Sequence, residues 1–325
     1  MLGMSFNVVS GDAKKDKMSL DALDFSSFIG QDEVLSKVRF YLASHDSSSP
    51  FPTLLFTGSH GLGKTYMANL VADNMGRNFC ELNASMVNGE KDFVEQFVMG
   101  HVAGTSPVTV LIDECHRLPK DVMTLLLTVL NPSDNKTVEI MYRNTRLSFD
   151  MRFLNFIFAT TDAFRMVAPL KNRCQEVYFR AYRYEELMQM LLYYLESDES
   201  IIKCDKDALI RACRNRGRDT YVLATNVKRY WDVYGTNHVI EQSDMERLFG
   251  ILGMDSFGLY RRETDLVKSI ATHGPISACN LAMVLMVSED NVKYELEVRP
   301  RELGLIQNTS KGRVVTNKGK EYLNV

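Results

Sequence analysis

The sequence predicts an α/β protein built on a doubly wound parallel sheet, followed by a small helical lid domain and a C-terminal winged helix. Short apolar runs alternate with amphipathic stretches from about Phe28 to Phe179, which is typical of such a sheet. Only helical periodicity follows from Tyr184 to Gly250, and three helical segments with a hairpin pattern fill the remainder. The expected boundaries are 1–20 for a polar lead-in, 21–182 for the sheet domain, 183–252 for the lid and 253–325 for the winged helix.

Composition restricts the class of protein further. A chain of 325 residues suits two or three small domains, and 45% apolar with 24% charged residues is ordinary for a globular protein. The net charge of -3 requires any nucleic-acid contact to come from a local basic patch. No apolar run reaches eighteen residues, so no membrane-spanning helix is expected. The six cysteines are scattered without a Cys-x-x-Cys pair, which favours a reducing, cytoplasmic location.

Three apolar runs predict the central strands of the sheet. Each is short, bounded by turn residues and rich in Val, Ile, Leu or Phe: Thr53–Thr57, Val108–Ile112 and Phe153–Ala159. The segment after Lys64 has helical periodicity, and its apolar face consists of Met67, Leu70, Val71 and Met75. Strands alternating with helices in this way predict the doubly wound domain.

The lid and the winged helix follow from periodicity and capping residues. The lid has an apolar stripe formed by Leu187, Met190, Leu191 and Tyr194, and no strand signal appears in it. In the last domain, one helix contains Leu266, a second begins after Ser277, and a third is capped by Ser288 and ends at Gly304. The expected wing pairs Leu305–Gln307 with Val314–Thr316 around the turn Ser310-Lys311-Gly312.

The segment GSHGLGKT, Gly58–Thr65, is the strongest chemical signal in the chain. It matches G-x-x-x-x-G-K-[ST] and stands between a predicted strand and a predicted helix. Gly58, Gly61 and Gly63 let backbone N–H groups approach phosphates closely. Lys64 supplies charge toward the β and γ phosphates, and the Thr65 hydroxyl is placed to ligate Mg²⁺.

A second motif, VTVLIDECH, places two adjacent carboxylates at the end of a buried strand. Asp113 is expected to hold Mg²⁺, and Glu114 to orient or deprotonate the attacking water. Two acids in this place are unfavourable unless a cation lies beside them. Neither His60, at a variable position of the loop, nor His116, which follows the acids, is expected to ligate a metal.

The third predicted strand ends in Thr160 and Thr161, where a polar side chain can sense the γ phosphate. Arg173 follows the next turn, in a position from which it can reach the nucleotide of a neighbouring subunit. A solvated surface arginine remains the alternative for Arg173.

These residues resemble the RuvB family of AAA+ ATPases, the bacterial Holliday-junction branch-migration motors. The shared strings are FIGQ at Phe28–Gln31, GLGKT, IDECHRLP at Ile112–Pro119, ATT at Ala159–Thr161, APL-x-x-R ending at Arg173, and the wing GLIQNTSKGRVVT at Gly304–Thr316. The likeness extends from about Leu23 to Leu323, and the ATPase strings alone are specific to AAA+ proteins.

The resemblance implies cofactors, partners and residue roles. ATP and Mg²⁺ are the expected ligands, with Thr161 as sensor 1 and Arg173 as arginine finger. The nucleotide-binding residues would include Phe28, Ile29, Leu62, Tyr66 and Tyr182, of which Phe28, Ile29 and Tyr182 would lie near the adenine. Arg313, with Lys311 and Asn308 beside it in the wing, would contact DNA. The family works as a six-membered ring around duplex DNA, so a homo-oligomer acting on duplex or four-way DNA is expected.

Three features depart from the family pattern. The sensor 2 arginine has no clear counterpart after Gly217, where Arg218 is the nearest candidate. Asn308 replaces a second basic residue of the wing. The hairpin predicted at Thr137–Asp150 corresponds to the family's docking site for the junction-binding protein RuvA, but its short tip, Arg143-Asn144-Thr145, puts a RuvA-like partner in doubt.

The C-terminal charge pattern supports DNA binding and leaves other ATP-dependent classes open. Six basic residues stand against one acid between Arg299 and Lys320, which suits phosphate contacts. A clamp loader or helicase loader is one alternative, because Asn172-Arg173-Cys174 resembles a string of clamp-loader subunits. A replication initiator that uses ATP as a switch and binds DNA through its winged helix is another.

Overall fold

The computed structural model describes residues 20–46, 49–95, 107–130, 137–142, 145–235 and 238–324. The chain divides into two compact units, Met1–Tyr182 and Arg183–Val325, each considered by itself below. Most of the predicted lead-in lies outside the described residues, as do Arg143 and Asn144 of the hairpin tip. Within the described ranges, no helix is long and apolar enough to cross a membrane.

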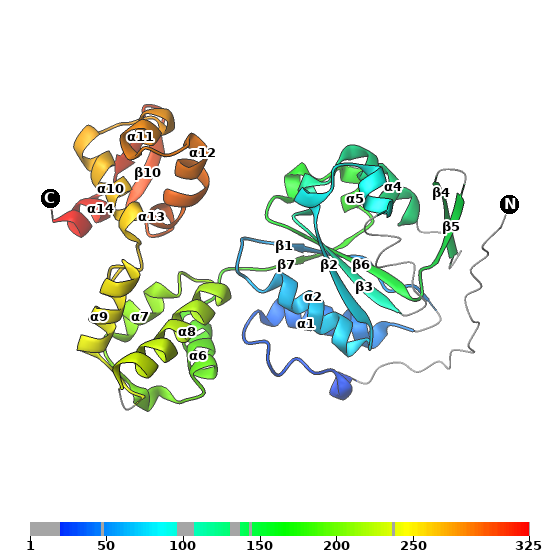
Figure 1. The fold of residues 1–325 in the computed structure, drawn as a ribbon, viewed down its shortest axis with the longest axis horizontal. Helices are drawn as coiled ribbons and strands as arrows, with labels where there is room; N and C mark the ends of the chain where they lie inside the picture. The colour runs from blue at the N-terminus through cyan, green and yellow to red at the C-terminus, as the bar shows by residue number, and fades with distance from the viewer. Residues whose placement is uncertain are drawn as a thin grey trace. The chain divides into compact units, whose positions relative to one another are not determined.

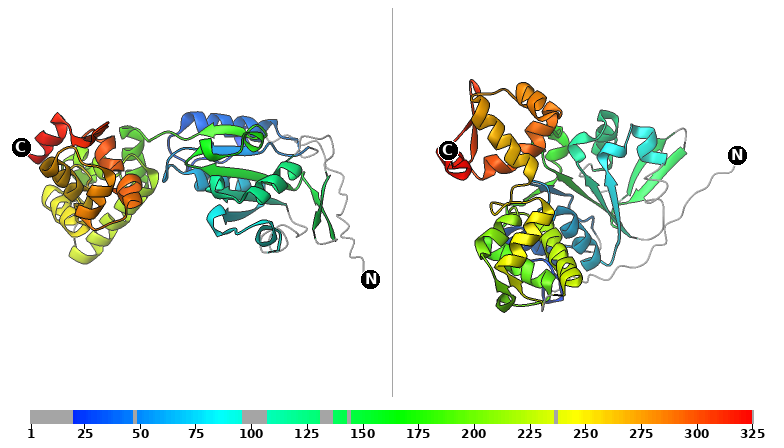
Figure 2. Two further views of the ribbon diagram at one scale, coloured as in Figure 1. Left: turned by 90° about the horizontal axis from the view of Figure 1, so that it is seen from above. Right: turned by 60° about the vertical axis from the view of Figure 1, so that its left-hand side comes forward.

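The first unit is built on a five-stranded, all-parallel sheet with the strand order β2-β3-β6-β1-β7. Its strands are β1 (Leu54–Thr57), β2 (Asn78–Asn83), β3 (Val108–Asp113), β6 (Leu154–Thr160) and β7 (Gln175–Tyr178). Its main helices are α1 (Asp32–Ser44), α2 (Lys64–Asn74), α4 (Lys120–Val129) and α5 (Ala168–Lys171), with a single turn, α3 (Glu90–Asp92). Helices α1 and α2 cover one face, and α4 and α5 the other (Figure 1); the right view of Figure 2, turned about the vertical axis, keeps this order of layers. The predicted doubly wound sheet is confirmed.

The three central strands form the core of this sheet. Every residue of β1 and β6 is buried, as are the first five of β3, because helices cover both faces. The two strands that the sequence did not predict are β2 and β7, which lie at the sheet edges and contain mostly exposed or half-buried residues. Thr57 pairs with Thr160 in the register of β1 and β6. The carboxyl ends of β1, β6 and β3 therefore meet at one edge.

A separate antiparallel hairpin, β4 (Thr137–Tyr142) with β5 (Thr145–Asp150), stands between α4 and β6 in the chain. The hairpin expected at Thr137–Asp150 is therefore present. Glu139 and Arg146 form an exposed ion pair on it.

The second unit begins with a helical segment, 183–252. It contains α6 (Tyr184–Leu195), α7 (Lys206–Ala212), α8 (Gly217–Tyr234) and α9 (Gln242–Leu252). The expectation of a segment without strands was wrong in detail, because β8 (Ile202–Lys203) pairs in parallel with β9 (Ile240–Glu241). Two-residue strands are too short to produce an alternating pattern in the sequence.

The rest of the second unit is a winged helix. Its helices are α10 (Arg261–His273), α11 (Ala278–Leu285), α12 (Glu289–Asn291), the π-helical turn Val292–Leu296, α13 (Val298–Glu302) and α14 (Asn317–Leu323). The wing pairs β10 (Ile306–Thr309) with β11 (Gly312–Val315). Both strands are offset from the predicted ranges, so Ser310 and Lys311 alone form the turn. Ser288 caps α12 through its hydroxyl, as predicted.

A buried ion pair joins the helical segment to the winged helix. Arg214, which follows α7, donates through Nη1 to Oε2 of Glu263 in α10 at 2.9 Å, and both side chains are buried. Arg299 of α13 donates through Nη2 to the carbonyl of Arg211 at 3.0 Å. Arg299 is itself buried, so it belongs to this joint and not to a surface for phosphates.

Candidate nucleotide site

The loop between β1 and α2 has a backbone that favours glycine. Gly61 and Gly63 adopt φ of 74° and 92°, which places both in the left-handed region. Gly58 has φ of 139°, and a Cβ there would lie 2.4 Å from the carbonyl oxygen of Phe179. The loop therefore passes close to β7 and leads into the amino end of α2, where unpaired N–H groups attract anions.

Lys64, the first residue of α2, is buried and pairs only with neutral groups in its hydrogen bonds. Its Nζ donates to the carbonyl oxygens of Gly58 and Ser59, both at 2.7 Å. Burial lowers the pKa of Lys64, while the nearby charges of Asp113 and Glu114 oppose that shift. Among the described residues, the ammonium thus has no carboxylate in direct contact, and its charge is left for a ligand.

Glu114 lies directly beyond β3 in the left-handed conformation, with φ of 49°. Its own N–H donates to Oδ1 of Asp113 at 2.9 Å. The Thr161 hydroxyl donates to Oε2 of Glu114 at 3.2 Å, which brings the end of β6 to the end of β3. The structure therefore gathers Asp113, Glu114 and Thr161 as the sequence predicts.

Two histidines that the sequence does not identify as site residues also contact Glu114. Nδ1 of His116 lies 3.2 Å from Oε2, and Nδ1 of His60 lies 3.4 Å from Oε1. Only 6% of the His116 side chain is exposed, and its Nδ1 is also 2.8 Å from Oγ1 of Thr160. Desolvation lowers the pKa of His116, which favours a neutral imidazole that orients Glu114. The sequence feature that could have identified them is their position within the phosphate-loop and acid motifs.

The residues expected near the nucleotide base surround the loop from a second side. Phe28 and Tyr66 stack with ring centroids 5.9 Å apart. The Tyr182 hydroxyl donates to the carbonyl of Leu62 at 2.9 Å. A Cβ at Gly63 would lie 3.2 Å from both the Phe28 ring and the Tyr182 hydroxyl, so glycine keeps these rings against the loop. Ile29 follows Phe28 and is half-buried.

Arg173 lies two residues after the end of α5 and two residues before β7. Its Nη1 donates to the carbonyl of Pro169 at 2.9 Å, and its Nε is buried with no hydrogen-bond partner among the described residues. Like Lys64, it pairs with a neutral acceptor. Arg218, the nearest residue to a sensor 2, is exposed in the first turn of α8, and sensor 2 stays unassigned.

The three wing residues expected to contact DNA fall into two groups. Lys311 and Asn308 are exposed. Arg313 pairs with Glu297 and only 14% of its side chain is exposed. DNA contact remains a prediction for Lys311 and Asn308, whereas the pairing of Arg313 indicates a role within the domain.

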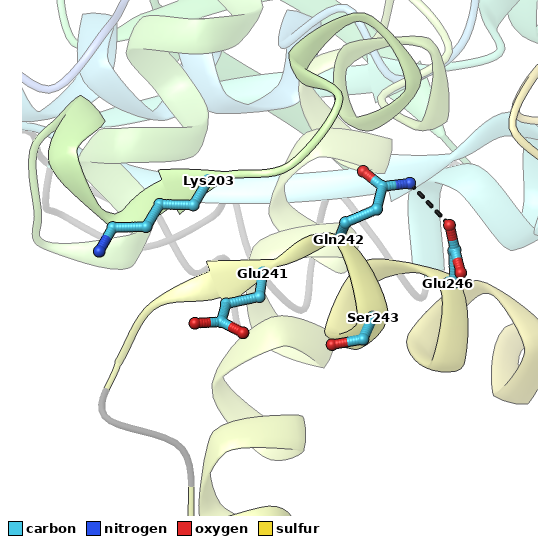
Figure 3. A pocket seen from close by; sticks show the side chains of 5 residues that line it. All are labelled: Lys203, Glu241, Gln242, Ser243 and Glu246. Carbon is cyan, nitrogen blue, oxygen red and sulfur yellow. Dashed lines mark hydrogen bonds between the residues drawn. The ribbon is translucent and has the colours of Figure 1, made fainter.

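A shallow depression in the helical segment does not suit a phosphate ligand. It is lined by Lys203, Glu241, Gln242, Ser243 and Glu246 (Figure 3). Gln242 donates to Glu246 at 2.8 Å, and the two carboxylates outnumber the one ammonium. A phosphate would meet net negative charge there.

The phosphate loop, the acid pair and the β6 threonines, all at one sheet edge, define a P-loop ATPase of the AAA+ class, here carrying a C-terminal winged helix. The family model described as Holliday junction DNA helicase RuvB P-loop domain matches residues 20–178, and the RuvB C-terminal winged helix domain matches residues 256–324. The chain belongs to this family: it is a RuvB-like AAA+ ATPase.

Curated relatives agree with this assignment, and a solved structure has the same fold. The chain is 27% identical over 321 residues to the Holliday junction branch migration complex subunit RuvB of Fervidobacterium nodosum, covering 95% of this chain and 89% of that protein. It is 27% identical over 312 residues to the corresponding subunit of Bdellovibrio bacteriovorus, with 91% of each covered. The structure of the Thermotoga maritima RuvB Holliday junction branch migration motor has the same fold, with a TM-score of 0.74 at 22% identity over 94% of this chain and 98% of that one.

Proposed function

We propose that the chain is an ATP-driven DNA motor that assembles as a homo-oligomeric ring, six-membered as in the family, and moves duplex or four-way DNA. The observation that supports it most is the contact between Thr161 and Glu114 beside the buried Lys64. This arrangement joins a sensor, a base and a phosphate-binding cation at one sheet edge. The relatives are named as subunits of a Holliday junction branch migration complex, so we propose branch migration as the process that hydrolysis drives.

The residues at the sheet edge fit ATP with Mg²⁺. Thr65 and Asp113 offer a hydroxyl and a carboxylate, which are the hard oxygen ligands that Mg²⁺ prefers, and the ion would neutralise charge on the phosphates. Lys64 binds the β and γ phosphates, and Glu114 orients the attacking water. His116 and Thr161 hold the Glu114 carboxylate in place through the contacts described above. Phe28, Ile29 and Tyr182 enclose the base side of the nucleotide, and Leu62 and Tyr66 complete the nucleotide-binding residues.

The ring supplies the last catalytic group in this proposal. Arg173 would complete the site of the adjacent subunit and stabilise charge in the transition state. This role is supported by the hydrogen bond of the Arg173 guanidinium, because its acceptor is a neutral carbonyl and the positive charge is left for a phosphate. The β4–β5 hairpin is the proposed surface for a RuvA-like junction-binding partner, and the scattered free cysteines favour a cytoplasmic location.

A synthetic four-way junction with homologous arms tests this function. With ATP and Mg²⁺, the protein should convert the junction into two forked duplexes, both with and without an added RuvA-type protein. Glu114→Gln should bind the junction without converting it. Hydrolysis of ATP and binding of DNA without any strand movement would contradict the motor and favour the initiator-type switch.

A further inference from the structure

Glu297 is a carboxylate buried inside the winged helix, and it lies between the π-helical turn and α13. Only 2% of it is exposed. It accepts two hydrogen bonds from Arg313, from Nε to Oε2 at 2.8 Å and from Nη2 to Oε1 at 3.3 Å, and a third from Arg301. A buried carboxylate is strongly unfavourable without such partners, so these arginines are required where they are.

The backbone of Arg313 is fixed as firmly as its side chain. Its N–H donates to the carbonyl of Ile276 at 2.8 Å, and the N–H of Ile276 donates back to the carbonyl of Arg313 at 3.1 Å. Gly312 beside it has φ of 129°, and a Cβ there would lie 2.6 Å from the Ile276 carbonyl oxygen. Residue 313 therefore joins the wing to the start of α11 through its backbone and to α13 through its guanidinium.

Lys311, the cation at the wing turn, differs from Arg313 in that its side chain is not held by an ion pair among the described residues. Lys311 is exposed, and no described residue supplies a carboxylate to its ammonium. Its backbone N–H donates to Oγ1 of Thr309 at 3.2 Å, and that hydroxyl donates to the carbonyl of Gly312 at 2.8 Å, so two hydrogen bonds hold the turn. An exposed ammonium on an ordered turn can contact a phosphate without breaking any internal ion pair.

We propose that Arg313 is a positioning residue: anchored on Glu297, it sets the orientation of the wing, and Lys311 is the cation that the wing presents to DNA phosphates. This rests on the proposed DNA-binding function and gives it a specific geometry. If Arg313 turned toward a phosphate, Glu297 would remain buried, and Arg301 would be its one remaining cation among the described residues. A bidentate guanidinium fork also fixes direction in a way that an ammonium cannot.

Duplex DNA binding by the full-length protein, measured against salt concentration, distinguishes positioning from contact. We expect Glu297→Gln and Arg313→Gln each to weaken binding by about tenfold, and the double variant to be no weaker than either single one, because both remove the same pair. The slope of log affinity against log salt should stay unchanged in Arg313→Gln and fall by about 0.9 in Lys311→Ala, the value for one phosphate contact. Lys268→Gln, which removes an exposed charge of the same domain outside the basic segment 299–320, is the matched control.

The contact alternative predicts the opposite sign for one variant. If Glu297 merely restrains a DNA-contacting Arg313, then Glu297→Gln would release the guanidinium and strengthen binding, and Arg313→Gln would lower the salt slope. Either result would overturn the proposal. Arg313→Lys adds a second test, since it preserves a phosphate contact but loses the fork: we expect it to bind as weakly as Arg313→Gln, and wild-type affinity would contradict us.

Hydrogen exchange without DNA separates this proposal from the motor function. In Glu297→Gln the amides of Ile276 and Arg313 should exchange faster, while those of β1 and β6 stay protected. Unchanged exchange at Ile276 and Arg313 would contradict the claim that Glu297 anchors Arg313, even if DNA binding is normal. Wild-type protein that fails to bind duplex DNA would instead contradict the proposed function, with the exchange result still valid for the wing.

Discussion

Lys64 at the phosphate loop and Arg313 in the wing are both largely buried cations, but their partners differ in charge. Lys64 donates to two neutral carbonyls, whereas Arg313 donates twice to the carboxylate of Glu297. A neutral acceptor satisfies the hydrogen bonds of a cation and leaves its charge in place for a ligand. A carboxylate satisfies the hydrogen bonds and also neutralises the charge, so the cation becomes part of the internal structure. The partner therefore indicates the role of a basic residue better than the motif that contains it.

The charge of the hydrogen-bond acceptor also divides the other arginines into two groups. Arg173 donates to the carbonyl of Pro169 and belongs with Lys64. Arg214 pairs with Glu263 and belongs with Arg313. Substitutions in the first group should impair nucleotide chemistry, and substitutions in the second group should impair stability or geometry.

The largest expected effect is on hydrolysis in Glu114→Gln. The amide keeps the shape of the side chain but cannot serve as a base, so kcat should fall by about 10²–10⁴-fold while ATP still binds. Single-turnover hydrolysis and a fluorescent-nucleotide titration measure the two quantities. The exposed change Glu33→Gln on α1 is the control, and near-normal turnover in Glu114→Gln would exclude Glu114 as the base.

Arg214→Ala should cause the largest loss of stability. It leaves Glu263 buried without its cation, with the backbone N–H of Tyr260 still donating to it, and breaking such a pair typically costs about 3–5 kcal/mol. Arg216→Ala breaks a more exposed pair with Glu302 and should cost less than about 1 kcal/mol. Urea unfolding of both variants makes the comparison, and equal midpoints would show that the Arg214 pair does not stabilise the joint.

Lys64→Ala should weaken ATP binding without weakening the fold. A hydrogen bond to a charged group contributes about 1.5–3 kcal/mol, so affinity should fall by about tenfold to a hundredfold or more. The unfolding midpoint should stay close to that of wild type, because no carboxylate loses its partner. A variant with wild-type affinity for ATP would refute the assignment of the phosphate loop.

The smallest effect is expected in Lys311→Ala. Loss of one exposed phosphate contact should lower duplex affinity several-fold and reduce the salt slope by about 0.9. Basal ATP hydrolysis and the unfolding midpoint should not change, since Lys311 has no internal carboxylate partner among the described residues. A slope equal to that of wild type would place the DNA contact elsewhere.

The features that could be predicted from the sequence are those that leave a pattern in adjacent or periodically spaced residues. The strands β1, β3 and β6 appeared as apolar runs because both of their faces are buried, while the edge strands β2 and β7 gave no such run. The phosphate loop was predictable because its residues are adjacent in the chain. The contact of His116 with Glu114 depends on the left-handed backbone of Glu114, and the pair of Glu297 and Arg313 joins two elements sixteen residues apart. Neither arrangement leaves a periodic signal in the sequence.

The central claim, a site shared between subunits of a motor, is tested most directly by mixing two inactive proteins, Arg173→Ala and Glu114→Gln. In randomly mixed rings, about a quarter of the interfaces would combine an intact Glu114 with an intact Arg173 from the neighbour. We predict that ATP hydrolysis recovers on mixing, with native mass spectrometry confirming co-assembly. Co-assembled rings that remain inactive would contradict the account, because Arg173 would then act within its own subunit or serve only as a surface residue.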